Sequence, residues 1–205
     1  MKQIFFMITI ASFVFVACND SNQAESDDMS KIDKDTTTQT AALSDDKDIK
    51  AVAVTYTNLD PKVAASVKQI VDHYLHIKNA LANDNGDEAS SGGKALFEAM
   101  NKIDKSLFTA EQKKIYEENE EDLKEHAEHI GKSKIDHSRE HFAMMSEEVY
   151  TLVKAFGAGK PLYHDHCPMY DNNKGALWLS ETKEIKNPYM GSKMPKCGTV
   201  EEKIQ

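Results

Sequence analysis

The stretch SKIDHSREHFAMMSEEVYTLVKAFG, residues 133–157, decides the predicted fold. Its large apolar residues recur at the spacing of a helix that packs against other helices. They are Ile135, Phe142, Val149 and Phe156, seven positions apart, with Met145 and Leu152 between them. Gly157 and Gly159 follow, and glycine commonly ends a helix. The stretch therefore predicts a helix of about 20 residues with one buried face.

Three more helices are predicted upstream. Asp60 followed by Pro61 is the pattern of an N-cap and a first helical residue, and NDNG at residues 83–86 stops that helix. A second helix spans about 87–106, where Gly92-Gly93 is either a weak point or a close helix contact. A third begins after Thr109, with Gln112 completing a capping box, and ends at Gly131. The apolar positions of the three are Val63, Val67, Ile70, Val71, Tyr74 and Leu81; Ala89, Leu96, Met100, Ile103 and Leu107; and Ile115, Leu123, Ala127 and Ile130.

Four helices of this length with short connections predict an all-α fold, an up-down antiparallel four-helix bundle. No segment alternates apolar and polar residues well enough to predict a strand. The part after Pro161 is expected to be an irregular tail that contains cysteine and methionine and packs on the bundle, with at most a short hairpin or one helical turn. Trp178 and Leu179 are the expected apolar anchor of this tail.

The N-terminus has the pattern of an export signal. MKQIFFMITIASFVFVAC, residues 1–18, has one lysine before an apolar run from Ile4 to Ala17, a length that favours a signal peptide over a spanning helix. Its last four residues resemble a bacterial lipobox, in which Cys18 becomes the lipidated first residue. We therefore expect a signal peptide at 1–17, lipidated Cys18 with a flexible polar tether at 18–58, and a folded domain at 59–205; an uncleaved anchor is the alternative.

The net charge and the cysteine content limit the classes of function that the sequence supports. The formal net charge of −9 argues against a nucleic-acid partner, because nucleic acids bind basic surfaces. With Cys18 assigned to the lipid, Cys167 and Cys197 remain. In an exported protein two cysteines form a disulfide by default, and a metal site is the competing interpretation.

Histidines gather near one predicted helix connection. His126 and His129 lie at the end of the third helix, and His137 and His141 lie near the start of the fourth. If the two helices are antiparallel, these four residues share one end of the bundle, where imidazoles can share a metal ion. His73 and His76 lie on the first helix, whose C-terminal end points the same way. The competing interpretation is that these histidines are ordinary surface residues.

The tail holds a second set of candidate ligands. Cys167 and Met169 are two positions apart, Met194 and Cys197 are three apart, and His166 precedes the first pair. Thiolate, thioether and imidazole suit Cu(I), whereas zinc accepts cysteine and histidine but rarely methionine. The alternatives are a Cys167–Cys197 disulfide, with the methionines filling gaps in the core.

The tail also resembles a known family. The sequence YHDHCPMYDNNKGALWLSETKEIKNPYMGSKMPKCGTV is similar to DUF3347 domains, which occur in small lipoproteins and at the C-terminus of copper/silver-efflux membrane fusion proteins. YLHIKNALANDN and IDHSREHFAMMSEEVY resemble the helices of the same family, so the resemblance covers about residues 60–203. The matching tail residues are Cys167, Pro168, Met169, Gly175, Ala176, Trp178, Leu179, Ser180, Ile185, Asn187, Pro188, Tyr189, Gly191, Met194, Cys197 and Gly198.

The resemblance implies heavy-metal binding or delivery in the periplasm. Together with the residues above, it leads us to expect a lipoprotein held on the periplasmic side or surface of a Gram-negative bacterium, in the outer membrane. Its expected cargo is Cu(I), with zinc as an alternative, and its expected partners are copper-efflux components. The second expectation is a structural or interaction module with a Cys167–Cys197 disulfide.

An enzyme is the least favoured class. No CxxC motif stands at a helix N-terminus to activate a thiol, and no nucleophile with a neighbouring base is recognisable. We therefore expect neither turnover nor a small-molecule substrate.

Overall fold

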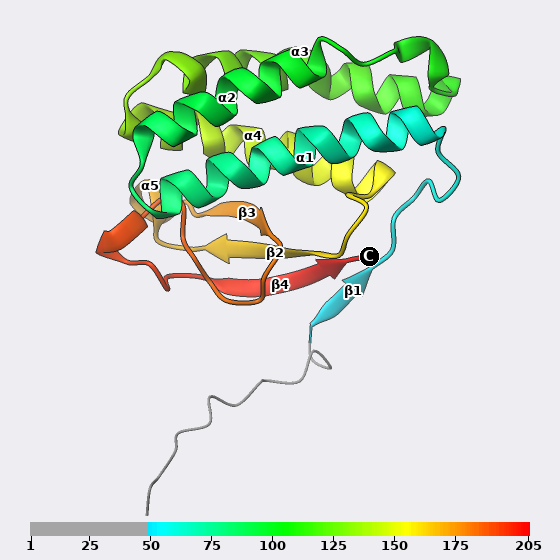
Figure 1. Cartoon of the computed structure of the whole chain (residues 1–205). Helices are drawn as coiled ribbons and strands as arrows, with labels where there is room; N and C mark the ends of the chain where they lie inside the picture. Colours follow the sequence, from blue (N-terminus) through cyan, green and yellow to red (C-terminus); the bar gives the residue numbers. More distant parts are fainter. Residues whose placement is uncertain (1–48) are drawn as a thin grey trace, which may run out of the picture. The chain divides into compact units, whose positions relative to one another are not determined.

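The computed structural model describes residues 49–205, which form four long helices and a four-stranded sheet (Figure 1). The predicted signal peptide at 1–17, Cys18 and the predicted tether up to residue 48 lie outside the described residues. Among residues 49–205, no helix combines the length and the apolar character that crossing a membrane requires.

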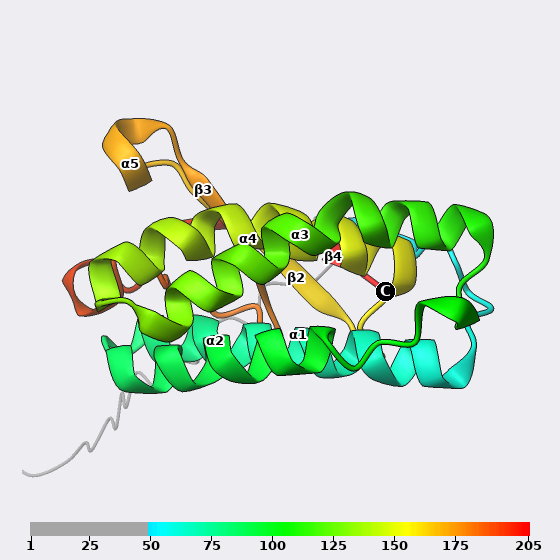
Figure 2. The same cartoon turned by 90° about the horizontal axis from the view of Figure 1, so that it is seen from above.

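The four predicted helices are present and alternate in direction, each packing on the next along the chain (Figures 1 and 2). They are α1 (Pro61–Ala82), α2 (Gly86–Met100), α3 (Ala110–Lys132) and α4 (Ile135–Phe156). Asp60 caps α1 by accepting a hydrogen bond from the Lys62 N–H, and Thr109 and Gln112 form the predicted capping box of α3. The second helix ends at Met100 rather than near 106, and a short 3₁₀ turn, η2 (Lys105–Leu107), follows it.

The predicted apolar stripe of α4 faces the core. Phe142, Met145, Val149 and Leu152 are almost completely buried, and the Phe142 ring stacks on Tyr74 of α1 with centroids 4.9 Å apart. Burial of these side chains supplies the main driving force that holds α4 against α1 and α3.

Gly93 marks a close contact between helices and is not a weak point. A Cβ atom at Gly93 would lie 2.8 Å from the carbonyl oxygen of Ala127 and 2.8 Å from the backbone nitrogen of Gly131. Real Cβ atoms do not approach backbone atoms so closely, so only glycine allows α2 to touch the last turns of α3. This contact fixes the end of α3, where His126 and His129 lie.

The expectation of an all-α fold is wrong, because the predicted irregular tail forms most of a mixed sheet. Its strands are β1 (Lys50–Val52), β2 (Leu162–Cys167), β3 (Ala176–Ser180) and β4 (Thr199–Ile204), in the order β1-β4-β2-β3. β1 is parallel to β4, and the other neighbours are antiparallel. A turn that contains α5 (Tyr170–Asn173), where Asp171 and Asn172 have left-handed backbone angles, connects β2 to β3. A longer segment, 181–198, connects β3 to β4 and contains η3 (Gly191–Lys193).

A bulge and buried polar side chains hide the strand pattern of β2. Its pairing with β4 shifts between His164 and Asp165, so both of these neighbouring residues are buried although alternation would bury only one. The residues buried along β2 therefore mix apolar with polar types, as in Leu162, His164, Asp165 and Cys167. Such a strand lacks the clean period of two on which sequence reasoning depends.

The folded part begins before residue 59. β1 lies inside the range 18–58 that the sequence assigns to a tether, and it pairs with β4 from Lys50 to Val52. The chain then stays attached to α4, because the N–H groups of Thr55 and Tyr56 donate to carbonyls near the end of that helix. The structure thus adds a strand and a short extended segment to the predicted domain.

Trp178 anchors the sheet to the helices, as the sequence predicts for the tail. Its side chain is fully buried on β3, which packs against α1 and α4 (Figure 1). The next residue, Leu179, donates its backbone N–H to the Tyr74 hydroxyl, and that hydroxyl also pairs with Ser146 of α4. β3 is therefore held by both apolar packing and hydrogen bonds.

Arg139 provides a second attachment for the C-terminal region. This buried side chain donates to the carbonyl oxygens of Pro188 and Leu81 and pairs with Asp84. It thereby joins α4, the α1–α2 connection and the segment before η3.

We expect Trp178→Ala to lower the free energy of unfolding by about 3 to 5 kcal/mol, because it removes a large, fully packed aromatic side chain. Met169→Ala is the matched control: that side chain is exposed, so its loss should cost less than about 1 kcal/mol. Chemical denaturation of both variants measures the difference, and equal costs would show that Trp178 does not anchor the sheet.

Candidate metal centre

The four histidines predicted to lie together occupy two neighbouring helix ends. His126 and His129 are in the last turns of α3, and His137 and His141 are in the first turns of α4. Only two residues separate the helices, so α4 turns back directly along α3. The structure places all four histidines at this end of the helical layer.

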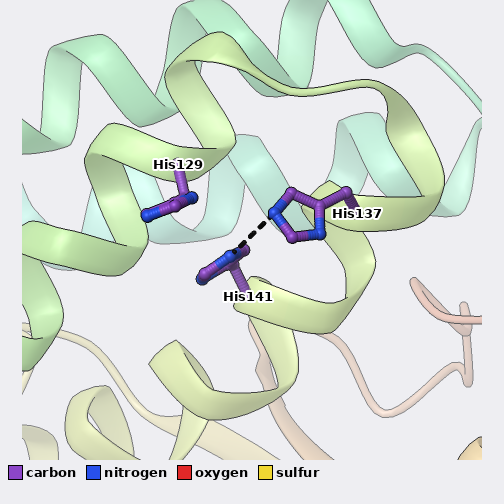
Figure 3. Close-up of side chains that lie close together, drawn as sticks. All are labelled: His129, His137 and His141. Atoms are coloured by element: carbon purple, nitrogen blue, oxygen red, sulfur yellow. Dashed lines mark hydrogen bonds between the residues drawn. The ribbon is translucent and has the colours of Figure 1, made fainter.

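Three of the four imidazoles form a compact group, which Figure 3 shows. His129, His137 and His141 can each offer one ring nitrogen such that all three nitrogens lie within 4.8 Å of one another. The Nε2 atoms of His137 and His141 are 3.1 Å apart, and the His129 ring stacks on His141 with centroids 4.1 Å apart. Ligand nitrogens at about 2.0 Å from a tetrahedral metal lie roughly 3.3 Å apart, so the three imidazoles are already near the spacing that one ion requires.

The group combines one buried imidazole with two accessible ones. The residue exposure of His141 is 8%, whereas the side chains of His129 and His137 are 46% and 50% exposed. Burial, followed by the neighbouring His129 and His137, lowers the pKa of His141 to about 4. His141 is therefore neutral at physiological pH, the state in which imidazole has a lone pair for a metal.

His126 belongs to the cluster but contacts a different atom. Its Nδ1 lies 3.1 Å from Nδ1 of His141, on the opposite side of that ring from the Nε2 that faces His137. Its own Nε2 lies 3.8 Å from a carboxylate oxygen of Glu148, a residue of α4. Burial raises the pKa of Glu148 to about 7 and lowers that of His126.

Sequence reasoning missed three carboxylates beside the cluster, one of which, Glu125, has its Oε1 atom 3.9 Å from Nε2 of His129. Oε2 of Glu140 lies 2.8 Å from Nδ1 of His137, and Glu148 adjoins His126. A signal was available, since Glu140 follows His137 by three positions and Glu148 follows His141 by seven, which are spacings of one helix face.

The other two helical histidines do not join the group. On α1, Nε2 of His76 pairs with Glu88 at 2.8 Å, and His73 lies three residues before it. Within residues 49–205, the His129, His137 and His141 set is the one group of three or more His, Cys, Asp or Glu side chains with metal-ligand proximity.

The two tail cysteines also converge. Cys167 ends β2 and Cys197 precedes β4, and their Sγ atoms are 3.1 Å apart as free thiols. A disulfide bond is about 2.05 Å long, so the sulfurs are in contact but unbonded. This proximity is compatible with both interpretations of the pair, a disulfide or a shared soft metal ion.

The remaining tail candidates differ in placement. Met169 and Met194 are 46% and 39% exposed, so neither fills a gap in the core. Met194 is joined to Cys197 by a turn in which the Cys197 N–H donates to the Met194 carbonyl. His166 leaves β2 on the face opposite to Cys167, because successive strand residues point to opposite faces, and its Nδ1 lies 3.5 Å from Glu201.

Fold and site together define a small α+β domain of four helices and a mixed sheet, in which α1 and α4 pack on the sheet and the ends of α3 and α4 carry the histidine cluster. The sequence model of the family described as Protein of unknown function (DUF3347) matches residues 70–160. Residues 70–160 therefore belong to the DUF3347 family, and the family resemblance is confirmed over that range. The match includes all four clustered histidines but ends before β2, so the cysteine pair lies outside it. No curated protein and no solved structure matches the chain.

Proposed function

We propose that this domain binds a transition-metal ion through His129, His137 and His141, and that its cargo is copper. The observation that carries the proposal is the convergence of three imidazole nitrogens, from two helices, within 4.8 Å. Three histidines with an open fourth position are a common protein site for zinc and other borderline metals.

The environment of the three rings supports metal binding over incidental packing. His141 is buried yet neutral, so it offers a lone pair without first losing a proton. His129 and His137 are half-exposed, so an ion can enter from solvent or from another protein without unfolding the helices. This combination suits an exchangeable cargo ion.

The chemistry of both donor sets favours copper. Imidazole binds zinc, nickel and copper, whereas a thiol pair near methionine is typical of Cu(I). The three most exposed large apolar side chains among the described residues are all methionines, namely Met144, Met169 and Met194. Copper is the ion that suits both the histidine group and the Cys167/Cys197 pair, and zinc remains the alternative cargo for the histidines.

The proposal also includes the location of the domain in the cell. The apolar run that ends at Ala17-Cys18 supports export and lipid attachment, with the domain held on the periplasmic side or surface of the outer membrane. There the domain would act as a metal chaperone, a buffer or an accessory of copper efflux, without catalysing a reaction.

The competing function is a structural or interaction module without metal. The contact between the sulfurs of Cys167 and Cys197 favours it, because oxidation in an exported protein would join them. In that case the bond would tie β2 to the segment before β4, and the histidines would have no shared role.

We predict that replacing His129 and His137 together with Gln weakens copper and zinc binding by more than about 100-fold, which exceeds the 10- to 100-fold typical of outer-shell changes. Both side chains are half-exposed, so the fold should persist. The matched control replaces His73 and His76 on α1 with Gln. Calorimetric titration measures the affinities, and equal affinities for the two double variants would reject the proposed centre.

Replacing the tail methionines tests whether the tail site prefers Cu(I) to zinc. Changing Met169 and Met194 to Leu should weaken Cu(I) binding by the reduced protein at least about tenfold, or ~1.4 kcal/mol, and leave zinc affinity nearly unchanged. Leu keeps the apolar volume, so the stability cost should stay below about 1.5 kcal/mol. Competition with a Cu(I) chelator measures the change. An unaltered Cu(I) affinity with both thiols reduced would give Cys167 and Cys197 a structural role only.

A further inference from the structure

A line of closely spaced polar side chains passes through the histidine cluster, with hydrogen bonds from His126 to Glu140 and an ion-pair distance at its Glu148 end. It begins at Glu148, whose Oε1 lies 3.8 Å from Nε2 of His126. It continues from Nδ1 of His126 to Nδ1 of His141 at 3.1 Å. The next contact joins Nε2 of His141 to Nε2 of His137 at 3.1 Å, the dashed line in Figure 3. It ends where Nδ1 of His137 meets Oε2 of Glu140 at 2.8 Å. Each of the three imidazoles therefore faces a neighbour with both of its nitrogens.

In the two α4 histidines, His137 and His141, the Nδ1 and Nε2 atoms have different neighbours. In both His137 and His141 the Nδ1 atom faces a side chain at the edge of the cluster, Glu140 or His126. In both residues the Nε2 atom faces the other histidine. A metal-binding histidine uses one nitrogen for the ion and normally donates its other N–H to a carboxylate or another acceptor, which fixes the ring and its tautomer.

From this arrangement we infer that His137 and His141 bind the ion through Nε2, and that Glu140, His126 and Glu148 are positioning residues outside the ligand set. The inference rests on the proposed metal-binding function. It also reassigns His126, which sequence spacing groups with the ligands.

With an ion bound to the two Nε2 atoms, the remaining N–H groups can be matched with acceptors. An ion on the two Nε2 atoms replaces the hydrogen bond between them, and each ring then has its hydrogen on Nδ1. The Nδ1–H of His137 donates to Glu140. The Nδ1–H of His141 donates to Nδ1 of His126, whose Nε2–H is directed at Glu148. The Nδ1–H groups of both ligand rings thus meet an acceptor within hydrogen-bond distance, and each end of the line is a carboxyl group.

The position of His126 argues against a direct ligand role. Its Nδ1 faces the side of the His141 ring away from His137, so an ion between His137 and His141 is out of its direct reach. His129 of α3 is the third ligand instead, because one of its ring nitrogens lies within 4.8 Å of those of His137 and His141. Burial also holds His126 in place at the contact between α3 and α4.

The experiment measures zinc binding to the full-length chain, with zinc as a diamagnetic probe. A Cys197→Ser background removes the thiol pair, so that the histidine centre is the site measured. Glu140→Gln should weaken zinc binding 10- to 100-fold at unchanged stoichiometry. Glu147→Gln is the matched control, with the same change of charge on the same helix at an exposed position outside the line, and it should change the affinity less than about twofold.

His126 receives two substitutions that separate positioning from ligation. His126→Phe keeps a ring of similar size in the buried position but offers no acceptor, so it should weaken binding as Glu140→Gln does without lowering the stoichiometry. His126→Gln restores a hydrogen-bonding group and should recover part of the affinity. Thermal unfolding of the metal-free variants reports any loss of fold separately.

Nitrogen-15 spectra of the zinc-loaded protein give the decisive readout, because they identify the coordinating nitrogen of each imidazole. The inference expects zinc on Nε2 of His137 and His141, with Nδ1–H retained on both rings. Coordination by His126, coordination of either α4 ring through Nδ1, or equal affinities for Glu140→Gln and Glu147→Gln would overturn the inference alone. A parent chain that binds no zinc would overturn the proposed function and this inference with it.

Discussion

The two-residue connection between α3 and α4 is the constraint on which the candidate centre depends. It is too short to let the helices diverge, so the last turns of α3 and the first turns of α4 must lie side by side. Gly93 strengthens the constraint, since only the absence of a side chain lets α2 pack on the α3 backbone at Ala127 and Gly131. His129, His137 and His141 are therefore brought together by backbone geometry, before any ion is present to collect them.

The backbone that holds the three histidines also affects how the candidate centre could bind an ion. A site whose ligands stand on two packed helices is largely formed before an ion arrives, so less conformational entropy is lost on binding than at a site on flexible loops. The half-exposed His129 and His137 leave the ion accessible, while the buried His141 is held by its neighbours. These features support the proposed role in binding and releasing a cargo ion. The Cys167/Cys197 pair, set in a different part of the fold, offers the softer donors that reduced copper prefers.

The sequence predicts the helices well because their signals are local. Capping residues such as Asp60 and Thr109 and the stripe from Phe142 to Leu152 act within single helices, and the clustering of the histidines follows from helix order alone. The sheet could not be predicted in the same way. β2 buries Asp165 and His164 across a bulge, which removes its alternating pattern, and β1 pairs with a strand about 150 residues away. The hydrogen-bond partners of the histidines depend on side-chain rotamers, which spacing does not specify.

The central claim is that three imidazoles share one metal ion. X-ray absorption at the zinc edge tests it most directly, on the full-length Cys197→Ser chain loaded with one equivalent of zinc. The account predicts nitrogen neighbours at about 2.0 to 2.1 Å, with the outer-shell scattering of three imidazole rings. A first shell of carboxylate and water oxygens, without imidazole scattering, would contradict it.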